Sequence, residues 1–133
     1  MNLKKYKNSS PRIKIIQKLY NSLMNPEAEI LYPKSQFKKY IKDVVTGTLE
    51  RIELIEESIN LHLSKDINLQ KTDKLLKIIL FAAVFELLFK HGTPKKVIIS
   101  EYLLASEHFL EKIQIGYLNA ILDKLALEIR KDE

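Results

Sequence analysis

The stretch from Asp73 to Lys90, DKLLKIILFAAVFELLFK, carries the strongest structural signal in this sequence. Apolar residues fill almost every position after Lys74, and only Lys77 and Glu86 interrupt them. A helix that is apolar on nearly all sides is central and is packed by other elements. Its longest uninterrupted apolar run has eight residues, whereas a membrane span needs roughly 20. We therefore predict a buried core helix and no membrane association.

Helices are predicted on both sides of this stretch. Ser10-Pro11 suits a helix start, because serine can cap the first turn and proline fits its first position. That helix ends before Asn25-Pro26, since the residue before a proline avoids the α region. Beyond the central stretch, His91-Gly92 marks an end and Thr93-Pro94 a new start. The last two helices are expected to turn these residues inward: Ile98, Tyr102, Ala105, Phe109, Leu118, Ile121, Leu122, Leu125 and Ile129.

The segment from Ser35 to Ser64 has one long apolar stripe. Spacings of three and four residues, typical of one helix face, separate Ile41, Val45, Thr48, Ile52, Ile55 and Ile59. The stripe predicts either one helix or two helices in line. Gly47 lies inside it and marks a kink or a close approach of helices, because glycine inside a helix costs about 1 kcal/mol against alanine. The patterns together predict an all-α domain over residues 11–133, preceded by a flexible basic tail at residues 1–10.

Positive charge is concentrated at the front of the chain. The formal net charge is +5, and the first 18 residues hold six basic residues and no acidic one. Such asymmetry is typical of a surface that binds phosphate; a tail that only improves solubility is the alternative. The chain has no cysteine, which excludes disulfides and thiolate sites, and no secretory signal is visible. These features predict a cytoplasmic protein.

No constellation of catalytic or metal-binding residues is visible. His62, His91 and His108 are scattered without metal-ligand spacing, and no phosphate-binding glycine motif occurs. We expect no enzyme, no metal and no cofactor. Glu86 and Glu101 lie among apolar neighbours, so each is either a buried carboxylate with a structural role or a contact to a partner protein.

Three stretches, taken in order, resemble one family. They are PRIKIIQKLY at residues 11–20, LFAAVFELLFKHGTPKKVIISEY at residues 80–102 and YLNAILDK at residues 117–124. The first is similar to the basic helix ending in Gln-x-Leu-Tyr of the NusB transcription antitermination family. The second resembles that family's Ala-x-Tyr-Glu-Leu helix and following turn, and the third its closing Phe-Val-Asn-Gly-Val-Leu-Asp-Lys segment. Residues 40–47, which end in Gly47, fit as well.

The resemblance implies a fold of two small three-helix subdomains and an activity of binding without catalysis. The implied ligand is single-stranded boxA RNA of nascent ribosomal transcripts. The implied partners are a NusE-type small-subunit ribosomal protein and the transcribing RNA polymerase complex. Lysines replace most of the family's N-terminal arginines here. Lysine lacks the two-pronged geometry of arginine, so we expect weak RNA binding alone and tighter binding with the partner.

The predicted binding residues follow from this resemblance and from the chemistry of RNA. Basic side chains contact phosphates, and aromatic rings stack on unpaired bases. The residues predicted to bind RNA are Lys4, Lys5, Lys7, Arg12, Lys14, Phe109 and Tyr117. The residues predicted to bind the partner protein are Tyr20 and Glu86. For Phe109 and Tyr117 the alternative is ordinary core packing.

Two other functions remain open from the sequence. Domains similar to NusB also precede ribosomal RNA cytosine methyltransferases, and this chain would then be a stand-alone relative, since its 133 residues leave no room for a methyltransferase domain. The other alternative is an interaction protein that has lost RNA binding, including a homodimer that covers its RNA surface.

Overall fold

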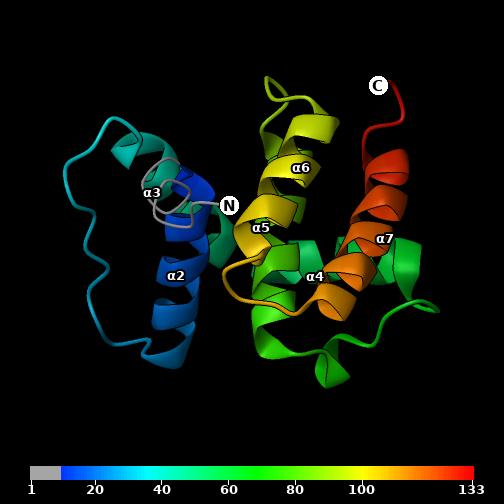
Figure 1. Cartoon of the computed structure of the whole chain (residues 1–133), viewed down its shortest axis with the longest axis horizontal. Helices are drawn as coiled ribbons and strands as arrows, with labels where there is room; N and C mark the ends of the chain where they lie inside the picture. The colour runs from blue at the N-terminus through cyan, green and yellow to red at the C-terminus, as the bar shows by residue number, and fades with distance from the viewer. Residues whose placement is uncertain (1–9) are drawn as a thin grey trace.

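The computed structural model describes residues 10–133, and this part of the chain is helical without any strand. Six α-helices and one short 3-10 helix follow one another (Figure 1). Their bounds are α2 Pro11–Met24, α3 Lys38–Glu50, α4 Ile52–Leu63, η1 Leu69–Lys71, α5 Lys74–Phe89, α6 Lys95–Ser106 and α7 Lys112–Ile129. The predicted all-α fold is confirmed. None of these helices is long and apolar enough to cross a membrane.

Helix α5 is the centre of the fold. It packs against α2 and α3 on one side and against α4, α6 and α7 on the other, as Figure 1 shows. Eleven of its 16 residues are buried, which explains why its sequence is apolar on nearly every face. Because α5 contributes to both groups of helices, the hydrophobic core is continuous through the protein.

The helix boundaries test several sequence predictions. The Ser35 to Ser64 stripe forms two helices, α3 and α4, which are separated at Arg51. Ser10 occupies the position before α2, but its hydroxyl makes no capping bond, so the predicted side-chain cap is wrong. The cap of α5 comes from Asp73, whose carboxylate accepts a hydrogen bond from the Leu76 amide at 3.1 Å. That bond satisfies one of the free amides of the first turn.

Gly47 marks a close approach of two helices. Helix α3 runs through Gly47 without a break, so the kink is not observed. The ring of Phe85 on α5 fills the space where a Cβ atom of residue 47 would stand. Phe85 is buried at 5% exposure and has little freedom to move aside. The absence of a side chain at Gly47 therefore lets α3 and α5 pack closely.

Substituting Gly47 by alanine should destabilise the protein. Overpacking a rigid core costs about 1–3 kcal/mol, which exceeds the roughly 1 kcal/mol that alanine gains over glycine within a helix. Urea unfolding would measure the change. Gly116→Ala is a matched control inside α7, where nothing lies within 4 Å of the added Cβ, and it should stabilise. A Gly47→Ala variant as stable as Gly116→Ala would contradict the steric role assigned to Phe85.

Candidate functional site

Arg12 and Glu86 form a buried ion pair between α2 and α5. Arg12 donates from Nε to Glu86 Oε2 at 3.1 Å and from Nη2 to Oε1 at 2.8 Å. Glu86 is 0% exposed and Arg12 is 7% exposed. Two parallel bonds of this kind are the strongest arrangement available to a guanidinium and a carboxylate. The pair compensates two charges that would be very costly to bury alone.

Two tyrosines complete this buried cluster. The hydroxyls of Tyr40 on α3 and Tyr102 on α6 both donate to the Glu86 carboxylate, and Arg12 Nη2 donates to the Tyr40 hydroxyl at 2.7 Å. Burial, reinforced by the Glu86 charge, raises the pKa of Tyr40 and of Tyr102 well above the ordinary value. Burial alone would lower the pKa of Arg12, but pairing with Glu86 outweighs it and raises that pKa. The cluster thus joins α2, α3, α5 and α6.

This geometry corrects two of the predicted surface roles. Arg12 was predicted to bind RNA and Glu86 to bind a partner protein, yet both side chains are buried and are bonded to each other. Neither can reach a ligand while the pair is intact. The alternative of a buried carboxylate with a structural role describes Glu86. Its partners are an arginine and two tyrosines, and the separation of 74 positions between Arg12 and Glu86 in the sequence hid the pairing from any local pattern.

Tyr20 and Phe109 lie on one surface hollow. The hollow has a volume of about 490 Å³ and is lined by Gln17, Lys18, Tyr20, Asn21, Leu75 and Phe109. Both aromatic side chains are half-buried and pack against the core on one side. Phe109 lies in the turn between α6, which ends at Ser106, and α7, and this turn places it beside the last turns of α2. The residue predicted for the partner and one predicted for RNA are therefore neighbours.

Tyr117 is a surface residue on α7. Its side chain is 41% exposed, so the alternative of core packing does not describe it. Its hydroxyl donates to the Asp66 carbonyl at 3.1 Å, and Lys124 forms an ion pair with the Asp66 carboxylate at 2.7 Å. These contacts hold the segment between α4 and η1 against α7. The ring is thereby fixed in orientation while part of it stays accessible.

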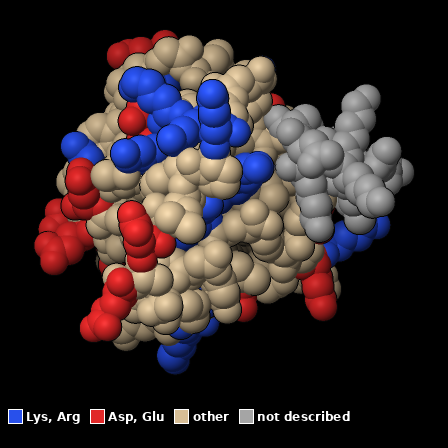
Figure 2. Space-filling view, turned by 90° about the vertical axis from the view of Figure 1, so that its left-hand side faces the viewer, with Lys and Arg blue, Asp and Glu red and all other residues tan. Residues whose placement is uncertain are grey.

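Lysines gather on the face formed by α2, α3 and their connection (Figure 2). Lys14 is exposed and lies at the edge of a small hollow lined by Lys14, Lys18, Tyr32, Pro33, Ser35, Lys38 and Ile41. The predicted RNA contacts Lys4, Lys5 and Lys7 lie outside the described residues. Lys38 and Tyr32 were not predicted to belong to this surface, because only the fold of the long connection brings them to α2.

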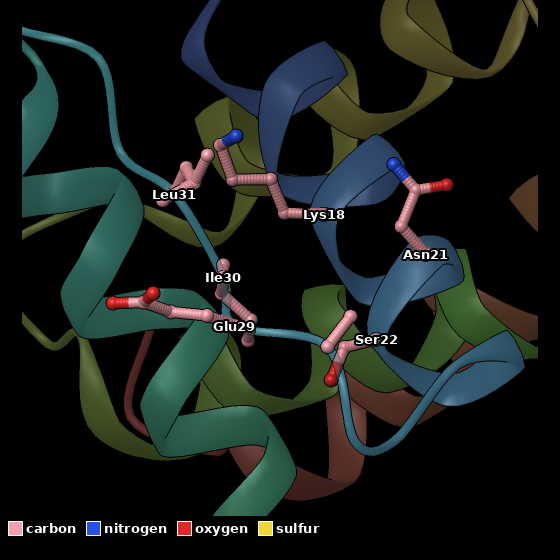
Figure 3. A pocket seen from close by; sticks show the side chains of 7 residues that line it. Lys18, Asn21, Ser22, Glu29, Ile30 and Leu31 are labelled. Carbon is pink, nitrogen blue, oxygen red and sulfur yellow. The ribbon is translucent and has the colours of Figure 1, made fainter.

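Lys18 lies where three hollows meet. It lines the hollow of Tyr20 and Phe109, the hollow of Lys14 and Lys38, and a third one beside the connection between α2 and α3. Figure 3 shows this third hollow, in which Lys18, Asn21 and Ser22 of α2 lie beside the segment from Glu29 to Leu31. The aromatic hollow and the lysine surface are therefore parts of one continuous face.

No cluster of three or more metal-binding side chains occurs between residues 10 and 133. The fold and the surface define an all-helical protein that presents lysines and partly exposed aromatic rings on adjoining surfaces. The sequence pattern of the NusB family matches residues 3–127. The chain belongs to the NusB family.

Individual relatives agree with this assignment. The transcription antitermination protein NusB of Sphingopyxis alaskensis is 25% identical over 148 residues and covers 98% of this chain and 99% of that protein. The Rickettsia typhi protein of the same name is 38% identical over 97 residues, which are 73% of this chain and 60% of that protein. The Rhodopseudomonas palustris HaA2 protein is 32% identical over 71% of this chain and 56% of its own length. The chain thus matches little more than half the length of some relatives.

A solved structure has the same fold. The NusB protein of T. maritima superposes with a TM-score of 0.77 over 89% of each chain, at 21% sequence identity. Helical packing of the kind in Figure 1 therefore recurs in a protein whose sequence has diverged widely from this one.

Proposed function

We propose that this protein is a transcription antitermination factor that binds boxA-like single-stranded RNA of nascent ribosomal transcripts together with a NusE-type ribosomal protein. The observation that carries the proposal is the exposed ring of Tyr117 on a NusB fold, fixed by its bond to Asp66. A fixed and accessible ring is what stacking on an unpaired base requires. Membership of the NusB family supports the same conclusion.

The other predicted residues divide between the two ligands. Lys4, Lys5, Lys7 and Lys14 supply positive charge for phosphates, and this charge makes the affinity depend on salt. Phe109 supplies a second ring at the hollow beside Tyr20. Tyr20 contacts the partner protein at that hollow, so that RNA and partner meet on the surface. The assembled pair joins the transcribing RNA polymerase in the cytoplasm.

Removing the ring of Tyr117 should weaken RNA binding. Stacking on an aromatic side chain contributes about 1–3 kcal/mol for each base, so Tyr117→Ala should lower the affinity roughly 5- to 150-fold. Tyr117→Phe keeps the ring but loses the bond to the Asp66 carbonyl that fixes it, so its affinity should lie between those of the unmodified protein and Tyr117→Ala. The measurement is a fluorescence titration with boxA-like RNA, with and without the NusE-type partner.

Phe89→Ala is the matched control for this titration. Phe89 is 40% exposed, close to the exposure of Tyr117, but it ends α5 and lies against Arg51. Its loss should leave the RNA affinity unchanged. Absence of any RNA binding at low salt, with the partner present, would overturn the proposed function and leave a protein that binds only other proteins.

A further inference from the structure

Four lysines surround one tyrosine on the face of α2 and α3. The Nζ atoms of Lys18 and Lys42 lie 5.6 Å and 6.0 Å from the centre of the Tyr32 ring. Lys14 and Lys38 line the same hollow as Lys18 and Tyr32. We call these five residues the lysine groove. Its members come from α2, from α3 and from the connection between them, so only the folded chain brings them together.

The lysine groove has no counter-charge of its own. Between residues 10 and 133, none of its four lysines forms an ion pair, and no acidic residue lines its hollow. The neighbouring Lys39 differs, since it pairs with Asp43 at 3.0 Å. Figure 2 shows the basic side chains grouped on this face, with most acidic side chains toward its edges.

Contacts with Tyr32 hold part of this charge in place. An ammonium group over an aromatic ring is attracted by the negative face of the ring, which limits the freedom of Lys18 and Lys42. Like charges held close together repel one another, and a bound anion relieves that repulsion. A row of phosphates fits such a surface better than a single carboxylate, because cations are supplied from two helices and not from one point.

Lys18 connects the groove with the aromatic hollow. It belongs to the groove through Tyr32 and also lines the hollow of Tyr20 and Phe109. Neither hollow has an acidic residue in its lining. A strand that leaves the aromatic residues can therefore cross Lys18 and continue over α3 without meeting negative charge in either hollow.

We infer that the lysine groove binds the sugar-phosphate backbone of RNA that flanks the segment held by the aromatic residues. This inference rests on the proposed function and extends the RNA path onto α3. Contacts with the backbone carry no sequence information. The groove thus adds affinity that depends on the length of the RNA and on salt, without changing which bases are preferred.

The test compares two RNAs and three variants of the full chain with its NusE-type partner. One RNA is a boxA-like strand of about 12 nucleotides, and the other is the same strand extended at both ends to about 24 nucleotides, since sites on single strands span a limited number of nucleotides. The test variant is Lys38→Gln with Lys42→Gln. Its charge-preserving control is Lys38→Arg with Lys42→Arg. A second control, Lys96→Gln with Lys131→Gln, removes two exposed lysines from α6 and the segment after α7.

The longer RNA should bind the unmodified protein more tightly than the shorter one. The salt slope is the decrease in the logarithm of the binding constant per unit increase in the logarithm of the salt concentration, and each phosphate contact on a single strand contributes about 0.7 to it. The double glutamine variant should therefore lose about 1.4 of that slope and bind the longer RNA roughly 10- to 30-fold more weakly. Its affinity for the shorter RNA should be unchanged, and both controls should bind as the unmodified protein does.

Two failures can be told apart. If the shorter RNA binds but lengthening it adds nothing, or if the glutamine variant keeps full affinity for the longer RNA, the lysine groove does not bind RNA and the proposed function stands. If neither RNA binds the unmodified protein, the proposed function is overturned together with this inference.

Discussion

Replacing Glu86 by glutamine is expected to lower the free energy of unfolding by about 3–5 kcal/mol, because it leaves the buried guanidinium of Arg12 without its counter-charge. The substitution keeps the size of the side chain, so the loss would come from charge and hydrogen bonding and not from a cavity. Guanidinium chloride unfolding, monitored by circular dichroism, measures the change. A loss of this size is a large part of the stability of a small domain.

A double substitution separates pairing from packing. Arg12→Met combined with Glu86→Gln removes both charges, while the amide oxygen at position 86 can still accept from the Tyr40 and Tyr102 hydroxyls, and removing both partners avoids the isolated buried charge that makes Glu86→Gln costly. We therefore expect the double variant to be clearly more stable than Glu86→Gln. If Glu86→Gln loses less than about 1 kcal/mol, Arg12 must reach water in the variant, and the buried pair would not be the tie between α2 and α5 that we describe.

The buried cluster also bears on binding. It fixes the first turn of α2 against α5, α3 and α6 through Arg12, Tyr40 and Tyr102. The lysines and aromatic residues of α2 follow within two to three turns of the same helix. A weakened cluster should therefore loosen the surface as well as the core, since binding groups act best when they are held in place beforehand.

Local patterns were sufficient to predict most of the helices. The apolar run of α5, the proline after Asn25 and the glycine after His91 each act over a few residues, so their effects can be found in a linear sequence. The apolar stripe of Ile41 to Ile59 was also predicted, and Ile41, Val45, Ile55 and Ile59 are all buried. Whether this stripe forms one helix or two was left open, because no proline or glycine marks the break at Arg51.

Pairings between distant residues could not be predicted in the same way. Arg12 counted as one more positive charge in a basic segment, and only the fold shows that Glu86 neutralises it. Tyr117 and Phe109 could be assigned to core or surface only once α7 and the turn before it were placed. The lysine groove escaped prediction for the same reason, since Tyr32 lies in a connection without regular structure.

Arg130 makes further long-range hydrogen bonds that could not be predicted from the sequence. It comes directly after α7 and is 5% exposed. The three nitrogens of its guanidinium donate to four carbonyls around the end of α5. These are the carbonyls of Glu86 at 3.3 Å, Leu87 at 2.6 Å, Lys90 at 3.0 Å and Thr93 at 3.1 Å. These include carbonyls that the last turn of a helix leaves without a partner. Its positive charge also suits the negative end of the helix dipole.

Arg130→Met should lower the free energy of unfolding by about 2 kcal/mol or more, because the carbonyls of Leu87 and Thr93 lose the donor that Arg130 supplies and each buried carbonyl left without a donor costs about 1–3 kcal/mol. The free energy of unfolding of Arg130→Lys should lie between those of Arg130→Met and the unmodified protein, since an ammonium group carries the charge but cannot span four acceptors. Lys131→Met is the matched control: Lys131 is the next residue and is exposed, so its loss should change stability by less than about 0.5 kcal/mol. Urea unfolding gives the ranking, and amide hydrogen exchange at Lys90, whose amide bonds to the Glu86 carbonyl at 2.8 Å, reports the end of α5 directly. Equal stability of Arg130→Met and Lys131→Met would show that water replaces the guanidinium at these carbonyls, and that the end of α5 does not depend on Arg130.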